Sequence, residues 1–110
     1  VGLCAEKTIT HLQCDVIRAN LAGVMAMMGE GEAALAEADA ALAGLEQRGA
    51  TDQSEYTQGL EARARALSAL GRKDEAIATQ QRVVDTMARL FDAGHPERLR
   101  VARNLETLRE

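Results

Sequence analysis

The chain has 110 residues, a formal charge of −4 and a pI near 5.2, with acidic and basic residues interspersed along it. This balance gives no support for binding to nucleic acid or to an anionic membrane, and no apolar run approaches the roughly 18 residues that span a bilayer. Apolar residues make up 46% of the chain and many are alanine, whereas proline occurs once and β-branched residues are sparse. The composition therefore predicts one all-α domain over 1–110 with an alanine-rich core.

The first predicted helix spans 3–28, because no Gly or Pro interrupts the chain between Leu3 and Leu21. Apolar residues at helical spacing predict that it buries one stripe, made of Leu12, Val16, Leu21, Val24, Met25 and Met28. Gly29 and Gly31 then mark a turn. The second predicted helix, 32–48, buries Leu35, Ala38, Ala41, Leu42 and Leu45, and Gly49 stands where a C-terminal cap is expected.

Three more helices are predicted after residue 50. Asp52 and Glu55 have capping-box spacing at the start of the third, and Asp74 favours the N-terminal end of the fourth. Pro96 suits the first position of the fifth helix, and His95 before it suits a capping role. The connections are short, so consecutive helices are expected to be antiparallel neighbours. The predicted bounds are 53–70, 73–92 and 96–110.

A unit of two helices joined by a glycine turn recurs with a period of 42 residues. Gly29 and Gly71 are separated by this interval, and Asn20-Leu21 returns two periods later as Asn104-Leu105. Such a period is typical of stacked repeats, which cannot bury their apolar faces alone. In this register Val1–Glu6 is either the tail of a preceding helix or an extension of the first helix. The extension is favoured, because helix propensity is high throughout.

Small and large apolar residues recur in the two units, most of them at positions 42 residues apart. They are Leu21, Ala22, Met25, Gly29, Ala34, Ala38 and Ala41, then Leu60, Ala64, Leu67, Gly71, Ala76 and Val83. Over nearly the whole chain this pattern resembles the tetratricopeptide repeat, in the spacing typical of kinesin-light-chain-like and many bacterial repeats. The resemblance implies a right-handed α-α superhelix of antiparallel helical hairpins, with five helices in about two and a half units.

Three residues depart from the pattern. Arg63 is expected either to snorkel or to bend its unit, whereas Glu106 and Arg109 are expected to make the last helix a solvated cap.

The resemblance implies a concave surface, lined by the first helix of each hairpin, that binds a protein or peptide. The positions that it implies for this surface are Val16, Ala19, Asn20, Gly23, Met27, Gln58, Glu61, Arg65, Ser68, Arg100, Arg103, Asn104 and Thr107. The amide of Asn20 either bonds a ligand backbone or lies in water. The three arginines either converge on a carboxylate or acidic peptide, or pair with Glu61 and Glu97 at helical spacing. Charge reversal at Arg65 or Arg103 is expected to weaken partner binding with little loss of helicity.

Cys4, His11 and Cys14 suggest a metal site, but three ligands at uneven gaps on one helical stretch do not close a tetrahedral geometry. We therefore expect free thiols, with no metal and no cofactor. Two cysteines make no disulfide framework, which favours a reducing cytoplasm. The sequence has no Ser/His/Asp arrangement, and Gly29-Glu30-Gly31 lacks the pattern of a nucleotide loop, so an enzyme is not expected.

These observations predict a scaffold or adaptor module that binds a protein or peptide partner, and neither nucleic acid nor a membrane. Two alternatives stay open. In one, the apolar ends of the stack pair with another copy, so that the chain is a homo-oligomerisation module. In the other, the chain is the regulatory part of a larger bacterial signalling protein, such as a kinase, cyclase or transcription regulator. The absence of a starting Met favours a fragment of a longer chain.

Overall fold

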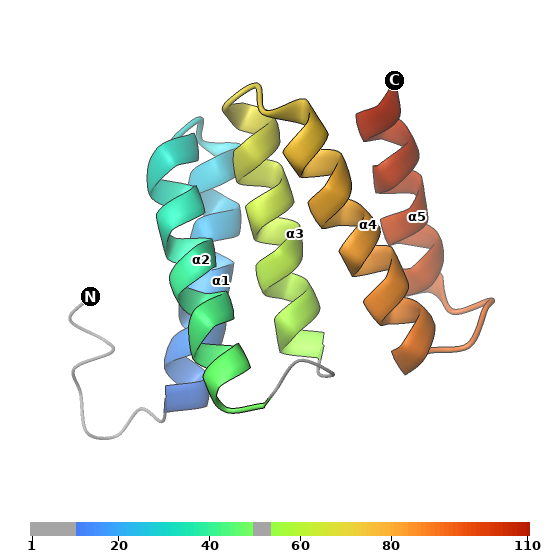
Figure 1. The fold of residues 1–110 in the computed structure, drawn as a ribbon, viewed down its shortest axis with the longest axis horizontal. Coiled ribbons are helices and arrows are strands. Elements are labelled where there is room, and N and C mark those ends of the chain that lie inside the picture. Colours follow the sequence, from blue (N-terminus) through green and yellow to red (C-terminus); the bar gives the residue numbers. More distant parts are fainter. Residues whose placement is uncertain (1–10, 50–53) are drawn as a thin grey trace.

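The computed structural model describes residues 11–49 and 54–110, and the side chains within 17–49 and 55–110. The described residues form five helices and no strand, which confirms the all-α class (Figure 1). The helices are α1 (His11–Met27), α2 (Gly31–Gln47), α3 (Ser54–Ala69), α4 (Lys73–Leu90) and α5 (Pro96–Arg109). Within the described residues these bounds agree with the predicted ones to within two residues. The predicted helical residues 3–10 and 53 lie outside the described part.

The turns inside the two hairpins have the same backbone geometry. In each turn the glycine has a positive φ, 83° at Gly29 and 77° at Gly71. The N–H of the next residue donates at 2.9 Å to a carbonyl of the preceding helix, that of Met25 in one turn and that of Leu67 in the other. Glycine adopts this conformation without the strain that a Cβ would bring. The backbone thus repeats at the interval of 42 residues at which the sequence repeats.

The helices form an open row and not a closed bundle. Helix α3 packs on both α1 and α2, and α4 packs on both α3 and α5. Figure 1 shows α1 behind α2 at one end of the row and α5 beyond α4 at the other. Among the described residues no extended packing joins α1 to α4 or α3 to α5. Helical hairpins therefore stand side by side, while a right-handed superhelix stays a prediction.

The core changes in side-chain size along the row. Toward α4 and α5 it is a cluster of large side chains: Leu42, Leu45, Tyr56, Leu60, Val83, Met87 and Val101. Toward α1 it consists of two groups of alanines, Ala22 with Ala38 and Ala62, and Ala26 with Ala34 and Ala66. Small side chains at these contacts bury little area per residue. The larger share of apolar burial therefore lies between α2, α3, α4 and α5.

Half of the apolar stripe predicted for the first helix is not buried. Leu21, Val24 and Met28 are 44%, 53% and 70% exposed, so the prediction that they are buried is wrong. The reason is that α1 packs on α2 and α3 through its alanines, which lie on a different side of the helix. Leu12 and Val16 belong to the same predicted stripe, but their side chains lie outside the described ones.

The predicted capping role of His95 is confirmed. Its Nδ1 accepts a hydrogen bond from the Glu97 N–H at 3.1 Å, and Pro96 occupies the first turn of α5. The imidazole also stacks on the ring of Phe91, with 4.2 Å between ring centroids. Local residues thus fix the start of α5. The capping box predicted at the start of α3 involves Asp52, which lies outside the described residues.

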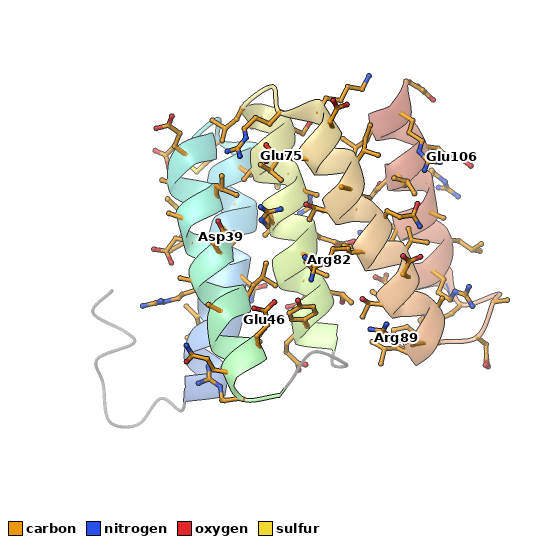
Figure 2. All side chains as sticks on the ribbon, in the orientation of Figure 1. Asp39, Glu46, Glu75, Arg82, Arg89 and Glu106 are labelled. Carbon is orange, nitrogen blue, oxygen red and sulfur yellow. The ribbon has the colours of Figure 1, made fainter. Side chains whose placement is uncertain are left out.

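Polar side chains join α2, α3 and α4 on the face that Figure 2 shows, where Asp39, Glu46 and Arg82 are labelled. Arg63 Nε donates to Asp39 Oδ1 at 2.9 Å, and its Nη1 donates to Thr79 Oγ1 at 2.7 Å. Arg63 is half-buried, and its guanidinium joins the exposed Asp39 of α2 to the buried Thr79 of α4. The two arrangements expected for an arginine at this position, snorkelling or a bend of its unit, stay predictions.

Tyr56 also bridges the helices, and its titration gives a testable prediction. Its hydroxyl donates to Glu46 Oε2 at 2.7 Å and accepts from Arg82 Nη2 at 2.8 Å. Burial, and next the hydrogen bond to Glu46, raise the pKa of Tyr56 above its ordinary value. The folded chain therefore holds the phenol proton more tightly than the unfolded chain. This contribution to stability is present below about pH 10 and is lost as the pH rises further.

The measurement is a phenolate absorbance titration, which reports Tyr56 alone because the chain has one tyrosine. We expect a higher midpoint in the folded protein than in urea. We also expect the free energy of unfolding of the wild type to fall more steeply above pH 10 than that of the Tyr56→Phe variant. Equal midpoints for the folded and unfolded chains would contradict the prediction.

Candidate functional site

Two hollows lie along the face formed by α1, α3 and α5. The Asn20 hollow, of about 380 Å³, lies where Asn20 of α1, Gln58 of α3 and Arg100 of α5 come together. The Asn104 hollow, of about 410 Å³, lies between the end of α1, the end of α3 and Asn104 of α5. Glu61 and Arg65 line both hollows. The two hollows therefore adjoin, and these two residues of α3 lie between them.

Most of the residues predicted for a concave surface line this site. Those in the Asn20 hollow are Ala19, Asn20, Gly23, Gln58, Glu61, Arg65 and Arg100. Those in the Asn104 hollow are Met27, Glu61, Arg65, Ser68, Asn104 and Thr107. Arg103 is exposed and lines neither hollow. The side chain of Val16 lies outside the described ones.

The spacing of these residues explains why they share a face. Asn20 and Met27 of α1 are seven residues apart, two helical turns, as are Gln58 and Arg65 of α3. Residues at this spacing lie above one another on a helix. The hollows stay open beside α3 because α5 packs on α4 and has no extended packing with α3. Local helix geometry thus supplies the lining, and the tertiary arrangement supplies the space.

One ion-pair cluster joins α3 and α5 across the Asn20 hollow. Arg100 Nη2 lies 2.9 Å from Glu61 Oε1 and 2.8 Å from Glu97 Oε2. Glu61 is 9% exposed. Its Oε1 is buried and accepts no hydrogen bond, so the ion contact with Arg100 is the interaction that the structure gives this atom. The hydrogen bond from Arg100 lowers the pKa of Glu97, and the same bond raises the pKa of Arg100. Arg100 is therefore held by two carboxylates within the protein.

The three arginines singled out from the sequence do not form one basic patch. Arg100 takes the paired alternative, with both Glu61 and Glu97. Arg103 lies outside the hollows. Arg65 is exposed and, within the described residues, has no ion pair or hydrogen bond. Its guanidinium is the cation that the site offers to a ligand.

Three amide side chains line the hollows without bonding to any other described residue. They belong to Asn20 and Gln58 in one hollow and Asn104 in the other. Each offers two N–H donors and a carbonyl acceptor, which match the hydrogen-bonding groups of a peptide backbone. Met27, whose side chain is largely exposed, adds apolar surface beside Asn104. The site thus combines backbone-like hydrogen bonding, one guanidinium and an apolar edge.

Comparisons with known proteins leave the family of this chain open. Comparison with protein-family models, with curated proteins and with solved structures gives no match. The functional interpretation therefore rests on the internal repeat, the two hollows and the side chains that line them.

The sequence did not point to Gln80, a polar residue of α4 that lines the Asn104 hollow. Gln80 is buried, and its Nε2 donates to the carbonyl of Val101 in α5 at 3.1 Å. It stands one period after Ala38, which is fully buried between the first three helices. One signal in the sequence could have identified Gln80: it is polar, whereas the corresponding residue of the preceding unit is alanine.

Metal and membrane roles gain no support from the described part of the chain. There, no group of three or more His, Cys, Asp or Glu side chains could hold a metal ion. Cys4 lies outside the described residues, as do the side chains of His11 and Cys14, so the expectation of free thiols stays a prediction. None of the described helices has the length and apolar content to cross a bilayer.

Proposed function

We propose that this chain is a binding module of the tetratricopeptide-repeat kind, whose α1–α3–α5 face holds an extended segment of a partner protein. One observation carries the proposal. Two adjoining hollows are lined by Asn20, Gln58, Arg65 and Asn104, and none of these side chains bonds to another described residue. These polar side chains come from three helices and are available to bond a ligand. Together they form a suitable site for the backbone and polar side chains of a peptide.

The repeat supports this proposal independently. The two hairpin turns share their hydrogen bonds and positive φ values at an interval of 42 residues. Burial follows the same interval, since Ala22 and Ala64 are both buried, as are Ala34 and Ala76. Hairpins that repeat in this way place α1, α3 and α5 on one side of the row, and a shared surface of this kind suits an extended ligand.

The charges suggest the composition of the ligand. Arg100 is neutralised by Glu61 and Glu97, so Arg65 remains to attract an anionic group. A guanidinium bonds a carboxylate through two N–H groups, which gives both strength and orientation. The proposed ligand is therefore a peptide segment with an acidic residue placed at Arg65 and backbone groups facing the three amides.

The test is selection of peptides from a random display library on the folded protein, followed by affinity measurements with variants. Arg65→Glu is expected to weaken the selected peptides about tenfold or more, since it replaces an attraction by a repulsion. Arg103→Glu is the matched control, because it reverses the same charge outside the hollows. The sequence alone had grouped these two arginines, and the structure separates them.

Circular dichroism must show equal helicity for both variants. Peptides that bind wild type, Arg65→Glu and Arg103→Glu equally would contradict the proposal. A selection that yields no peptide would also contradict it. The oligomerisation alternative would be favoured instead if sedimentation shows a stable dimer of the wild type and no dimer after Asn20 and Gln58 are changed.

A further inference from the structure

Glu61, which lies between the two hollows, has a buried oxygen atom that lacks a hydrogen bond. The residue is 9% exposed, yet it lines both the Asn20 hollow and the Asn104 hollow. Among the side chains that the structure describes, its Oε1 is the one buried nitrogen or oxygen atom without a hydrogen bond. Buried polar groups nearly always have a partner, because an unmet acceptor costs free energy. The missing bond therefore marks a place where a donor is expected.

The charges around this oxygen do not balance. Arg100 contacts both Glu61 and Glu97, at 2.9 Å and 2.8 Å, so two carboxylates share one guanidinium and the cluster keeps one negative charge. Arg65 brings the opposite charge, and it has no ion pair within the described residues. No other charged residue of the described part lines either hollow. The site thus offers one excess negative charge and one unpaired positive charge.

The spacing of these charges fits an extended peptide. Glu61 and Arg65 are four residues apart on α3, which is one helical turn and a rise of about 6 Å along the axis. In an extended chain, residues two apart point to the same side and are separated by about 6.5 Å. A segment that runs along α3 therefore matches both charges when its own opposite charges are two residues apart.

We propose, as a refinement that rests on the proposed function, that the α1–α3–α5 face selects a peptide segment that carries both charges. A lysine or arginine of the segment bonds the Glu61–Glu97 pair, and an acidic residue two positions away pairs with Arg65. The cation of the segment supplies the donor that Glu61 Oε1 lacks. Rotation about the terminal torsion, which is soft in glutamate, turns this oxygen toward the hollow. The side chain of Glu97 is 47% exposed and so is open to the same cation.

A segment with acidic residues alone fits this face less well. It places a further negative charge beside Glu61 and Glu97, and like charges brought together oppose binding. A water molecule can donate to Glu61 Oε1, but it leaves the excess negative charge of the cluster uncompensated. A ligand cation satisfies both the unmet acceptor and the charge.

The test is selection from the random peptide display library, carried out in parallel on the wild type and on Glu61→Gln, which keeps the shape of the side chain and removes its charge. Peptides selected on the wild type are expected to carry Lys or Arg two residues from Asp or Glu. Those selected on Glu61→Gln are expected to keep the acidic residue and to lose the basic one. Glu106→Gln is the matched control and is expected to select like the wild type, because it removes the same kind of charge on α5 outside both hollows (Figure 2).

One peptide enriched on the wild type then measures the coupling between the two charges. Replacement of its basic residue by methionine is expected to weaken binding to the wild type about tenfold or more, and binding to Glu61→Gln less than about twofold. Because both changes remove the same interaction, their effects on the binding free energy overlap and do not add. If Glu61→Gln acted only through the fold, the methionine replacement would weaken binding to both proteins equally.

The outcomes separate this inference from the proposed function. A selection that yields no peptide contradicts both. Peptides with an acidic residue but no basic residue at the stated spacing overturn this inference alone. Equal selections on the wild type and on Glu61→Gln also overturn it, and the donor to Glu61 Oε1 is then water. If circular dichroism shows that Glu61→Gln has lost helicity, Glu97→Gln takes its place with the same expected results, because the Glu97 side chain is partly exposed.

Discussion

Replacement of Leu60 by alanine is expected to lower the free energy of unfolding by about 2–5 kcal/mol, the range for deleting a buried leucine side chain. Leu60 is fully buried in the cluster of large side chains that joins α2, α3, α4 and α5. It lies on α3, which packs on α2 at one side and on α4 at the other. Because both neighbours hold α3 in place, the cavity left by the missing atoms cannot close fully. The loss is therefore expected in the upper part of the range.

Urea unfolding followed by circular dichroism measures this loss. Leu99→Ala is the control, because Leu99 is exposed on α5 and its truncation is expected to cost less than about 0.5 kcal/mol. The stability of small domains is typically about 5–15 kcal/mol, so a loss of the predicted size is easily resolved. Equal midpoints for the two variants would show that the large-residue cluster does not dominate the core.

Local signals in the sequence were sufficient to place the helices. Glycines with a positive φ, a conformation that other residues rarely adopt, follow α1, α2 and α3. Pro96 begins α5. These residues act through their own backbone conformations, so they need no knowledge of the tertiary structure. The capping role of His95 could be predicted for the same reason.

Burial was less predictable, because helical spacing identifies an apolar line but not the neighbour that covers it. Leu21 and Arg63 occupy the same position in successive units. The leucine is substantially exposed, and the arginine is half-buried between α2 and α4. Residue type alone predicts the reverse. What decides the outcome is the presence of α2 beside α3 and the lack of an equivalent described helix beside α1.

The candidate site shows the same division. Asn20 and Arg65 were expected to share a face because of the resemblance, and both line the Asn20 hollow, since each helix fixes the direction of its own residues. Spacing could not separate Arg100, which pairs with a glutamate 39 residues away, from Arg65, which has no such partner within the described residues. Pairing depends on the distance between α3 and α5, and no local pattern encodes that distance.

Removal of Arg100 is the second change with a large expected effect. Arg100→Met keeps an apolar stem but leaves the buried carboxylate of Glu61 without its cation. A buried charged group without a partner is destabilising, and we expect a loss of about 1–3 kcal/mol in the free energy of unfolding. Glu61→Leu is expected to cost less than about 1 kcal/mol, because the partly exposed Arg100 keeps its pair with Glu97.

The double variant distinguishes this explanation from a simple loss of packing. If the cost of Arg100→Met comes from the stranded carboxylate, then adding Glu61→Leu removes that carboxylate and recovers part of the stability. Urea unfolding of the wild type, both single variants and the double variant gives the coupling free energy directly. Additive losses would show that Arg100 acts through contacts other than Glu61. The Arg100–Glu61 pair spans the Asn20 hollow from α3 to α5. If the double variant recovers stability, this ion pair helps to hold α5 beside α3 and so to set the shape of the hollow. A ligand that competes with Glu61 for Arg100 would then loosen α5.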